Sequence, residues 1–103
     1  MIFTLRNFSN DMHITVTFVG ILAELIQEST VQVSLPREAT YGDLLKEIGR
    51  RFGRSIPDPL WDRQTNAFKD PIFAVASGRA IDSHDTPLTE GEEVKFLTLV
   101  AGG

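Results

Sequence analysis

The sequence predicts a single α+β domain of 103 residues in which one helix packs across one face of a sheet. Two segments in its first third alternate apolar and polar residues with the period of two that is typical of half-buried strands. The next segment places apolar residues at helical spacing, and three apolar runs separated by turn residues follow it. A chain of this length can bury one two-layered core, but it cannot build a deep substrate cleft as well.

The first two predicted strands are residues 13–19 and 30–35. Ile14, Val16 and Phe18 share one face of the first strand, and the second repeats the same alternation of β-branched and polar residues. The glycine and the polar residues of segment 20–29 favour a turn or a wide hairpin loop. The two strands are therefore expected to pair antiparallel.

A helix is predicted to begin after Thr40. This threonine is a favourable N-cap, and the negative charge of Asp43 suits the first helical turn. Gly53 marks the end of the helix. The apolar stripe that would face the sheet consists of Tyr41, Leu44, Leu45, Ile48 and Phe52.

Residues 54–71 contain three prolines and show no period, which predicts an ordered loop with a short helical turn near Trp61. Trp61 and Phe68 are expected to pin this loop to the core rather than to bind a ligand. Pro36 separates the second strand from the helix in a similar way.

The last third of the chain is predicted to complete the sheet. Residues 72–77 form a strand, and Ser77-Gly78 makes a tight turn into a short strand at 79–82. The final strand, residues 94–100, carries apolar residues on both faces. Such a pattern indicates a central strand with one side under the helix.

The N-terminal residues stand apart from this pattern. Ile2, Phe3 and Leu5 could add an edge strand, but residues 7–11 then interrupt it. Residues 1–11 are therefore interpreted as an N-terminal extension, with an edge strand and disorder as the two alternatives. Residues 12–103 form the predicted domain.

Composition and charge exclude several classes of function. A net charge of −4 and a pI near 5.0 argue against nucleic-acid binding, which needs a basic surface. The chain has no cysteine and therefore no thiol for catalysis or zinc binding, and His13 and His84 are read as surface residues. We expect no bound metal, no bound cofactor and no membrane contact. The absence of a signal peptide pattern and of a long apolar run makes the cytoplasm the expected compartment.

The end of the chain, Val100-Ala101-Gly102-Gly103, is the strongest candidate for chemistry. Glycine has no Cβ, so Gly102 gives clearance in a narrow channel. The Gly103 carboxylate is a usable acyl group but a poor electrophile until it is activated. Adenylation would convert it to a mixed anhydride, from which sulfide or an amine could displace AMP. The protein would then be a substrate and not a catalyst.

Acidic residues gather before the last strand. They are Asp82, Asp85, Glu90, Glu92 and Glu93. One interpretation is a solvated turn. The other is an acidic rim beside the tail that steers a basic partner surface.

The sequence resembles the MoaD/ThiS sulfur-carrier family, and by its length it is closer to MoaD. The resemblance rests on residues 85–103, DTPLTEGEEVKFLTLVAGG, in which an acidic glycine-containing turn leads into a final strand and a terminal Gly-Gly. Residues 12–20, MHITVTFVG, are similar to a typical MoaD start. The resemblance implies a ubiquitin-like β-grasp fold, which is a mixed sheet of four to five strands with one main helix across one face.

The resemblance also implies the partners. A ubiquitin-activating-like enzyme would use ATP to adenylate Gly103, and a sulfur donor would convert it to a thiocarboxylate. The sulfur would pass to a pterin precursor on the large subunit of molybdopterin synthase, with this chain as the small subunit, or to thiazole synthase for thiamine. Two other functions stay open. One is a ubiquitin-like modifier joined to lysines through Gly103, and the other is a non-covalent β-grasp interaction module.

Apolar residues near the end of the last strand are the candidate partner-binding surface, since such residues on an otherwise solvated sheet face usually mark an interface. For Phe96, burial under the helix is the alternative. The candidates are Phe96, Leu97, Leu99, Val100 and Ala101.

Overall fold

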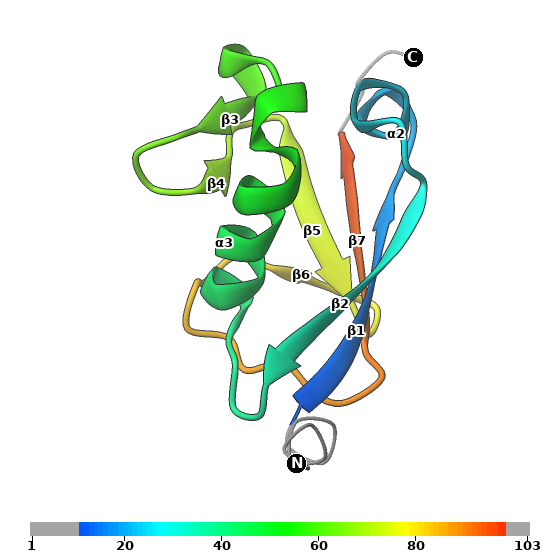
Figure 1. The fold of residues 1–103 in the computed structure, drawn as a ribbon, viewed down its shortest axis with the longest axis vertical. Coiled ribbons are helices and arrows are strands. Elements are labelled where there is room, and N and C mark those ends of the chain that lie inside the picture. Colours follow the sequence, from blue (N-terminus) through cyan, green and yellow to red (C-terminus); the bar gives the residue numbers. More distant parts are fainter. Residues whose placement is uncertain (1–10, 99–103) are drawn as a thin grey trace, which may run out of the picture.

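The computed structural model describes residues 11–98, which form a five-stranded sheet with one main helix across one face (Figure 1). The strand order is β2-β1-β7-β5-β6. The sheet strands are β1 (Asp11–Phe18), β2 (Thr30–Pro36), β5 (Ile72–Ala76), β6 (Arg79–Ile81) and β7 (Glu93–Thr98). The helices are α2 (Ile21–Ile26) and α3 (Tyr41–Phe52), followed by the short 3-10 turns η1 (Gly53–Ser55) and η2 (Asp58–Leu60). The predicted ubiquitin-like β-grasp architecture is confirmed.

The central strand β7 is the last element of the fold. It runs parallel to β1 and antiparallel to β5, so the sheet is mixed, as predicted. Both neighbours are long enough to pair along most of its length, from Thr15↔Glu93 to Phe18↔Phe96 on one side and from Ala76↔Val94 to Ile72↔Thr98 on the other. Strand β7 is thus held on both sides.

Strands β1 and β2 pair antiparallel as predicted, from Asp11↔Pro36 to Thr17↔Thr30. The connection between them was expected to be a turn or loop, and that prediction was wrong because it contains α2. Leu22 and Ile26, four residues apart, are buried on one side of this helix. Gln27 ends the helix in the left-handed conformation. Burial of two side chains stabilises a helix too short to form alone.

Gly20 makes the sharp change of direction from β1 into α2. Its φ of 67° and ψ of −131° lie in a region open essentially to glycine alone, although no atom stands within 4 Å of where a Cβ would be. We expect Gly20→Ala to lower the free energy of unfolding by about 1 to 3 kcal/mol through backbone strain alone. Gly78→Ala, at a φ of +79° in the β5–β6 turn, should cost only about 1 kcal/mol. Urea unfolding measures both, and equal stabilities of the two variants would contradict this account.

Helix α3 begins and ends where the sequence predicted. Thr40 and Asp43 form a capping box, in which the Thr40 backbone N–H donates to Asp43 Oδ2 at 2.9 Å and the Asp43 N–H donates to Thr40 Oγ1 at 3.4 Å. Gly53 is the C-cap. The predicted stripe faces the sheet, with Phe52 at its partly buried end and the other members buried: Tyr41, Leu44, Leu45 and Ile48.

Residues 54–71 are more regular than the predicted loop. A two-stranded hairpin, β3 (Trp61–Asp62) and β4 (Ala67–Phe68), follows the short turn η2, which confirms the predicted helical turn near Trp61. Asp62 Oδ1 closes the hairpin loop by accepting the Gln64 N–H at 2.9 Å. The Thr65 N–H donates to the same oxygen, and these two backbone donors lower the pKa of Asp62.

The hairpin packs against the core as predicted. Trp61 is 2% exposed and meets Phe68 edge-on, with 4.9 Å between ring centroids. A Cβ on Gly49 of α3 would come within 2.9 Å of Trp61 Cζ2, so only glycine allows this close approach. The Trp61 ring therefore sets the distance between the hairpin and α3.

The core lies between α3 and the inner face of the sheet. Every second residue of β1, from Met12 to Phe18, is buried in it. Burial also raises the pKa of Tyr41 to about 12. Because the tyrosine of an unfolded chain ionises near pH 10, the stability of the fold should fall as the pH rises above about 10.

Residues 1–10 of the predicted extension lie outside the described residues. Strand β1 begins at Asp11, one residue before the predicted domain boundary. Within residues 11–98, no helix is long and apolar enough to cross a membrane.

Candidate functional site

The candidate site is the end of β7, because this strand leads to Gly103. Thr98 is the last described residue and pairs with Ile72 at the beginning of β5. The other predicted site residues lie outside the described residues, with the exception of Phe96 and Leu97. Those outside are Leu99, Val100, Ala101, Gly102 and Gly103.

Phe96 is part of the core and not of a docking surface. Its exposed fraction is 0%, and its ring lies 4.9 Å from that of Phe68, 5.9 Å from that of Phe18 and 6.2 Å from that of Tyr41, measured between centroids. The prediction that Phe96 binds a partner is wrong, and the alternative of burial under the helix is confirmed. The physical reason is the alternation of β7, which points Val94 and Phe96 to the same inner face.

Leu97 points to the outer face of the sheet, away from α3, and is half-buried. It pairs directly with Phe73 of β5. On its other side lies Val19, because the parallel register Phe18↔Phe96 places the next residues side by side and the Val19 N–H donates to the Phe96 carbonyl at 2.9 Å. Val19, just after β1, therefore forms an apolar row with Leu97 of β7 and Phe73 of β5 at the end of β7, which we call the terminal row.

The terminal row is the apolar end of a face that becomes polar toward the beginning of β7. The next row on this face combines Thr17, Lys95 and Val75. Beyond it, Thr15 pairs with Glu93, and Thr17 Oγ1 donates to Glu93 Oε2 at 2.6 Å. Apolar surface suited to a partner is thus concentrated at the Thr98 end of β7.

An apolar hollow of about 530 Å³ extends the terminal row beyond Phe73. Asp70, Pro71, Ile72, Phe73 and Ala80 line it. Ile72 is opposite Thr98 in the sheet, so the hollow also borders the end of β7. The sequence could not place the terminal row, because its members come from segments distant in sequence.

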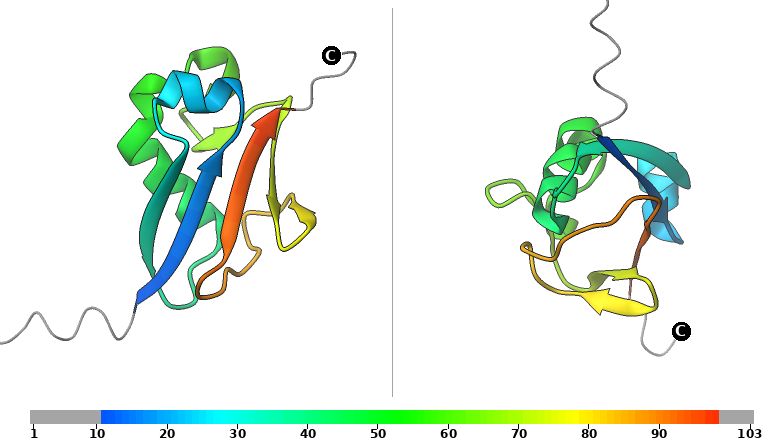
Figure 2. Two further views of the ribbon diagram at one scale, coloured as in Figure 1. Left: turned by 90° about the vertical axis from the view of Figure 1, so that its right-hand side faces the viewer. Right: turned by 90° about the horizontal axis from the view of Figure 1, so that it is seen from below.

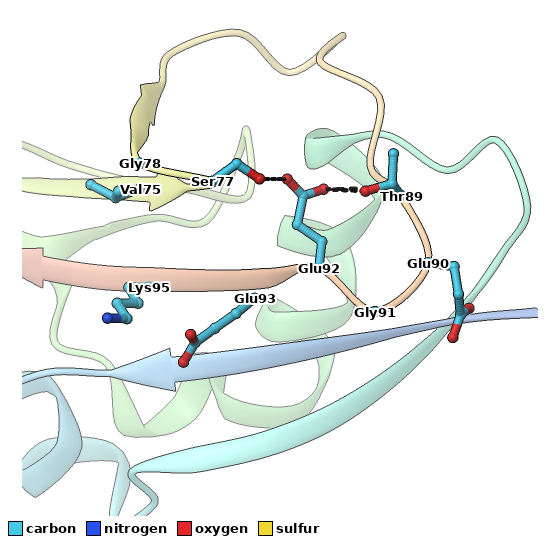
Figure 3. Close-up of a pocket in the computed structure, with 9 residues that line it drawn as sticks. All are labelled: Val75, Ser77, Gly78, Thr89, Glu90, Gly91, Glu92, Glu93 and Lys95. Carbon is cyan, nitrogen blue, oxygen red and sulfur yellow. Dashed lines mark hydrogen bonds between the residues drawn. The ribbon is translucent and has the colours of Figure 1, made fainter.

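The acidic turn lies at the other end of β7. Glu92 holds the turn in place by accepting the Ser77 hydroxyl at 3.0 Å and the Thr89 hydroxyl at 3.2 Å (Figure 3). It also accepts the Thr89 N–H at 3.0 Å. Glu90 accepts the His13 N–H at 2.9 Å. Ser77, Thr89, Glu90 and Glu92 line a hollow of about 480 Å³.

The acidic turn does not border the end of β7, but Asp82 lies toward that end. It follows Ile81, the partner of Ala74 in β5, and it lines a hollow together with Ile72 and Phe73. Glu90, Glu92 and Glu93 lie where the strand begins. Asp85 lies in a connection that joins the first turn of α3, where the Tyr41 N–H donates to the Thr86 carbonyl. The predicted acidic rim beside the end of β7 is therefore wrong for four of its five residues, and only Asp82 lies on that side. The contacts of the turn support a structural role.

The two histidines lie on the surface, as predicted. His13 points outward from β1, with its Nδ1 3.5 Å from Glu90 Oε2. His84 is exposed, and its ring lies 6.0 Å from that of Tyr41. Within the described part of the chain, no three His, Asp or Glu side chains gather closely enough to hold a metal ion.

Comparison with known proteins agrees with this geometry. The model of the ThiS family matches residues 16–103. No curated protein sequence matches the chain significantly.

Solved structures share the fold. SAMP1 from Haloferax volcanii superposes with a TM-score of 0.73 at 22% identity, over 88% of this chain and 99% of that one. The putative molybdopterin converting factor subunit 1 of Pyrococcus furiosus gives 0.67 at 21% identity, over 86% and 99%. A chain from the complex of subunits 1 and 2 of molybdopterin-converting factor of Helicobacter pylori gives 0.59 at 20% identity, over 89% and 100%.

Proposed function

Because this chain belongs to the ThiS family, we propose that it is a sulfur carrier whose Gly103 carboxylate is adenylated and then converted to a thiocarboxylate. The observation that carries the proposal is the position of β7 within the family match. This strand is paired with β1 up to Phe96 and with β5 up to Thr98, and the match continues through the five following residues to Gly103. A firmly held strand next to a short chain end suits delivery of that end into another protein.

The chemistry needs activation of a carboxylate in two steps. In the first, an oxygen of the Gly103 carboxylate attacks the α-phosphorus of ATP, and pyrophosphate leaves. In the second, a sulfide sulfur attacks the acyl carbon of the mixed anhydride, and AMP leaves with the bonding electron pair. The product is a thiocarboxylate, and the chain takes part as a substrate. Gly102 and Gly103 present no Cβ that would narrow access to the acyl carbon.

We assign the chain two successive partners in the cytoplasm. The first is an ATP-using, ubiquitin-activating-like enzyme, which supplies ATP binding. The second is the large subunit of a molybdopterin synthase, to which this chain would be the small subunit. The support is the fold shared with molybdopterin converting factor subunit 1, which in the Helicobacter pylori structure is in complex with subunit 2. Because the matching family is ThiS, thiazole synthase is the alternative acceptor of the sulfur.

A second candidate function is that of a protein modifier. The fold likeness to SAMP1, a small archaeal modifier protein, favours it. In that case a lysine amine, and not sulfide, would displace AMP and form an isopeptide bond with Gly103. Gly-Gly remnants on lysines in digests of cellular proteins would support this function over sulfur transfer.

The adenylation step is tested by ATP–pyrophosphate exchange with a candidate adenylating enzyme. We expect exchange that depends on the chain and saturates with its concentration, because the Gly103 carboxylate is consumed and regenerated in the reversible step. Leu97→Ser should raise the concentration of the chain that is needed for half-maximal exchange, since Leu97 lies at the centre of the terminal row. An absence of exchange with every enzyme of this class would favour the non-covalent interaction module instead.

A further inference from the structure

Two large apolar side chains are exposed among residues 11–98, and they lie two positions apart. Val19 is 40% exposed and Ile21 is 53% exposed. Gly20, between them, makes the turn from β1 into α2. Two exposed β-branched residues on either side of this glycine give the turn an apolar surface, and we call Val19 and Ile21 together the α2 corner.

The α2 corner has no evident packing role. Leu22 and Ile26 provide the buried side of α2, and Phe18 is the last core residue of β1. On the outer face of β1, the residues that precede Val19 in the same alternation are Thr15 and Thr17, so a polar residue would fit that strand equally well. The apolar character of the corner is therefore unexplained by the fold.

The corner lies beside the end of β7. Val19 is the neighbour of Leu97 in the terminal row, and its N–H donates to the Phe96 carbonyl at 2.9 Å. Helix α2 lies at the end of the sheet where β7 ends (Figures 1 and 2). The corner thus continues the terminal row past the edge of β1.

The length of the segment between Thr98 and Gly103 limits how far from the α2 corner a partner's active site can lie. Five residues separate Thr98 from Gly103, and even fully extended they span only about 17 Å. An active site that receives Gly103 must therefore come within that distance of Thr98. A standard interface of about 800 Å² per partner has a radius of about 16 Å, which covers the neighbouring strands. Strands are about 4.8 Å apart, so the α2 corner falls inside such an interface.

We propose that Val19 and Ile21 form an apolar contact for the enzyme that adenylates Gly103. The contact rests on the proposed function, which supplies that enzyme. It anchors the carrier on one side of the exit point, while Leu97 and Phe73 make contact on the other. The enzyme would carry an apolar patch beside the channel that admits the glycine tail.

The test is the steady-state kinetics of adenylation of the double variant Val19→Thr/Ile21→Ser. A docking contact acts equally on the bound and the reacting complex, so its loss raises KM and leaves kcat unchanged. We expect KM for the carrier to rise about tenfold, with kcat within about twofold of the wild type. Threonine keeps the shape of valine in the strand, and serine is acceptable at the first position of a helix.

His13→Ser is the matched control. His13 points outward from β1 like Val19, but it lies six residues earlier, about 20 Å along the strand. Its KM should equal that of the wild type. Ile21→Ser alone, at a more than half-exposed position, provides a second variant with little risk to the fold, and it should raise KM about threefold.

Four outcomes would overturn the contact, three of them without touching the proposed function. An unchanged KM in both corner variants would show that the enzyme does not touch this corner. A fall in kcat without a rise in KM would mean that the residues act on the chemistry. Loss of self-association in sedimentation, with KM unchanged, would make the corner an interface between copies of the chain. Failure of the wild type to be adenylated would reject the proposed function itself, and the contact with it.

Discussion

Deletion of Gly103 is expected to abolish adenylation while leaving the free energy of unfolding within about 0.5 kcal/mol of the wild type. The deletion moves the carboxylate back by one residue, about 3.5 Å. A misplacement of about 1 Å can already cost a hundredfold in rate, so kcat/KM should fall by at least about that factor. Stability should not change, because the buried core of residues 11–98 reaches only to Phe96 in the sequence.

A second variant separates the effect of the carboxylate position from the effect of adding a Cβ at the last residue. Gly103→Ala keeps the carboxylate at the same distance from Thr98 and adds only a Cβ. Its rate should lie between those of the wild type and the deletion. Thermal or urea unfolding of all three proteins provides the stability comparison. A deletion variant that is adenylated at the normal rate would contradict the assignment of Gly103.

Phe96→Ala is expected to have the largest effect on stability, lowering the free energy of unfolding by about 3 to 5 kcal/mol. The ring has no exposed surface and joins α3, the β3–β4 hairpin and β1 through Tyr41, Phe68 and Phe18. Its removal would leave a cavity in the middle of the core that these elements cannot all close. Such a loss approaches the total stability of a small domain.

Leu97→Ala, one residue later, is the matched control for Phe96. Leu97 faces outward and is half-buried, so its truncation should cost far less stability and should instead weaken binding of the adenylating enzyme. Urea unfolding and the KM of adenylation measure the two effects. If Phe96→Ala kept its stability and lost binding, the core assignment of Phe96 would be wrong.

Local patterns in the sequence predicted most of the fold because they depend on neighbouring residues. The alternation Ile14, Val16, Phe18 determines one face of β1 whatever strand lies beside it. Thr40 and Asp43 contact each other within a single turn, so the beginning of α3 could be read directly. Ser77 and Gly78 both have positive φ in the β5–β6 turn, as a tight hairpin requires.

The wrong predictions concern segments whose structure depends on contacts between residues distant in the sequence. Helix α2 is six residues long and has weak local signals, and burial of Leu22 and Ile26 stabilises it. The β3–β4 hairpin depends on the packing of Trp61 beside Gly49, which is distant in sequence. In β7 the inner face carries Val94 and Phe96, and the outer face carries Glu93 and Lys95 before Leu97. The alternation therefore favoured burial of Phe96, which was the alternative to its predicted docking role.

The candidate site was predicted only in part for the same reason. The glycine pair that ends at Gly103 could be recognised from the sequence, since its chemistry needs no partner residue. Val19 and Phe73 could be joined to Leu97 only through the register of three strands. Strand register across 24 residues on one side and 78 on the other is a non-local property, which the local alternation of a single strand does not contain.

The most direct test is the intact mass of the chain after incubation with ATP, a sulfide donor and a candidate adenylating enzyme. The account predicts a mass increase equal to the replacement of one oxygen by sulfur, located at Gly103 by fragmentation and absent without ATP. An unchanged mass under conditions in which the same enzyme converts its own established carrier, or sulfur found at any other residue, would contradict it.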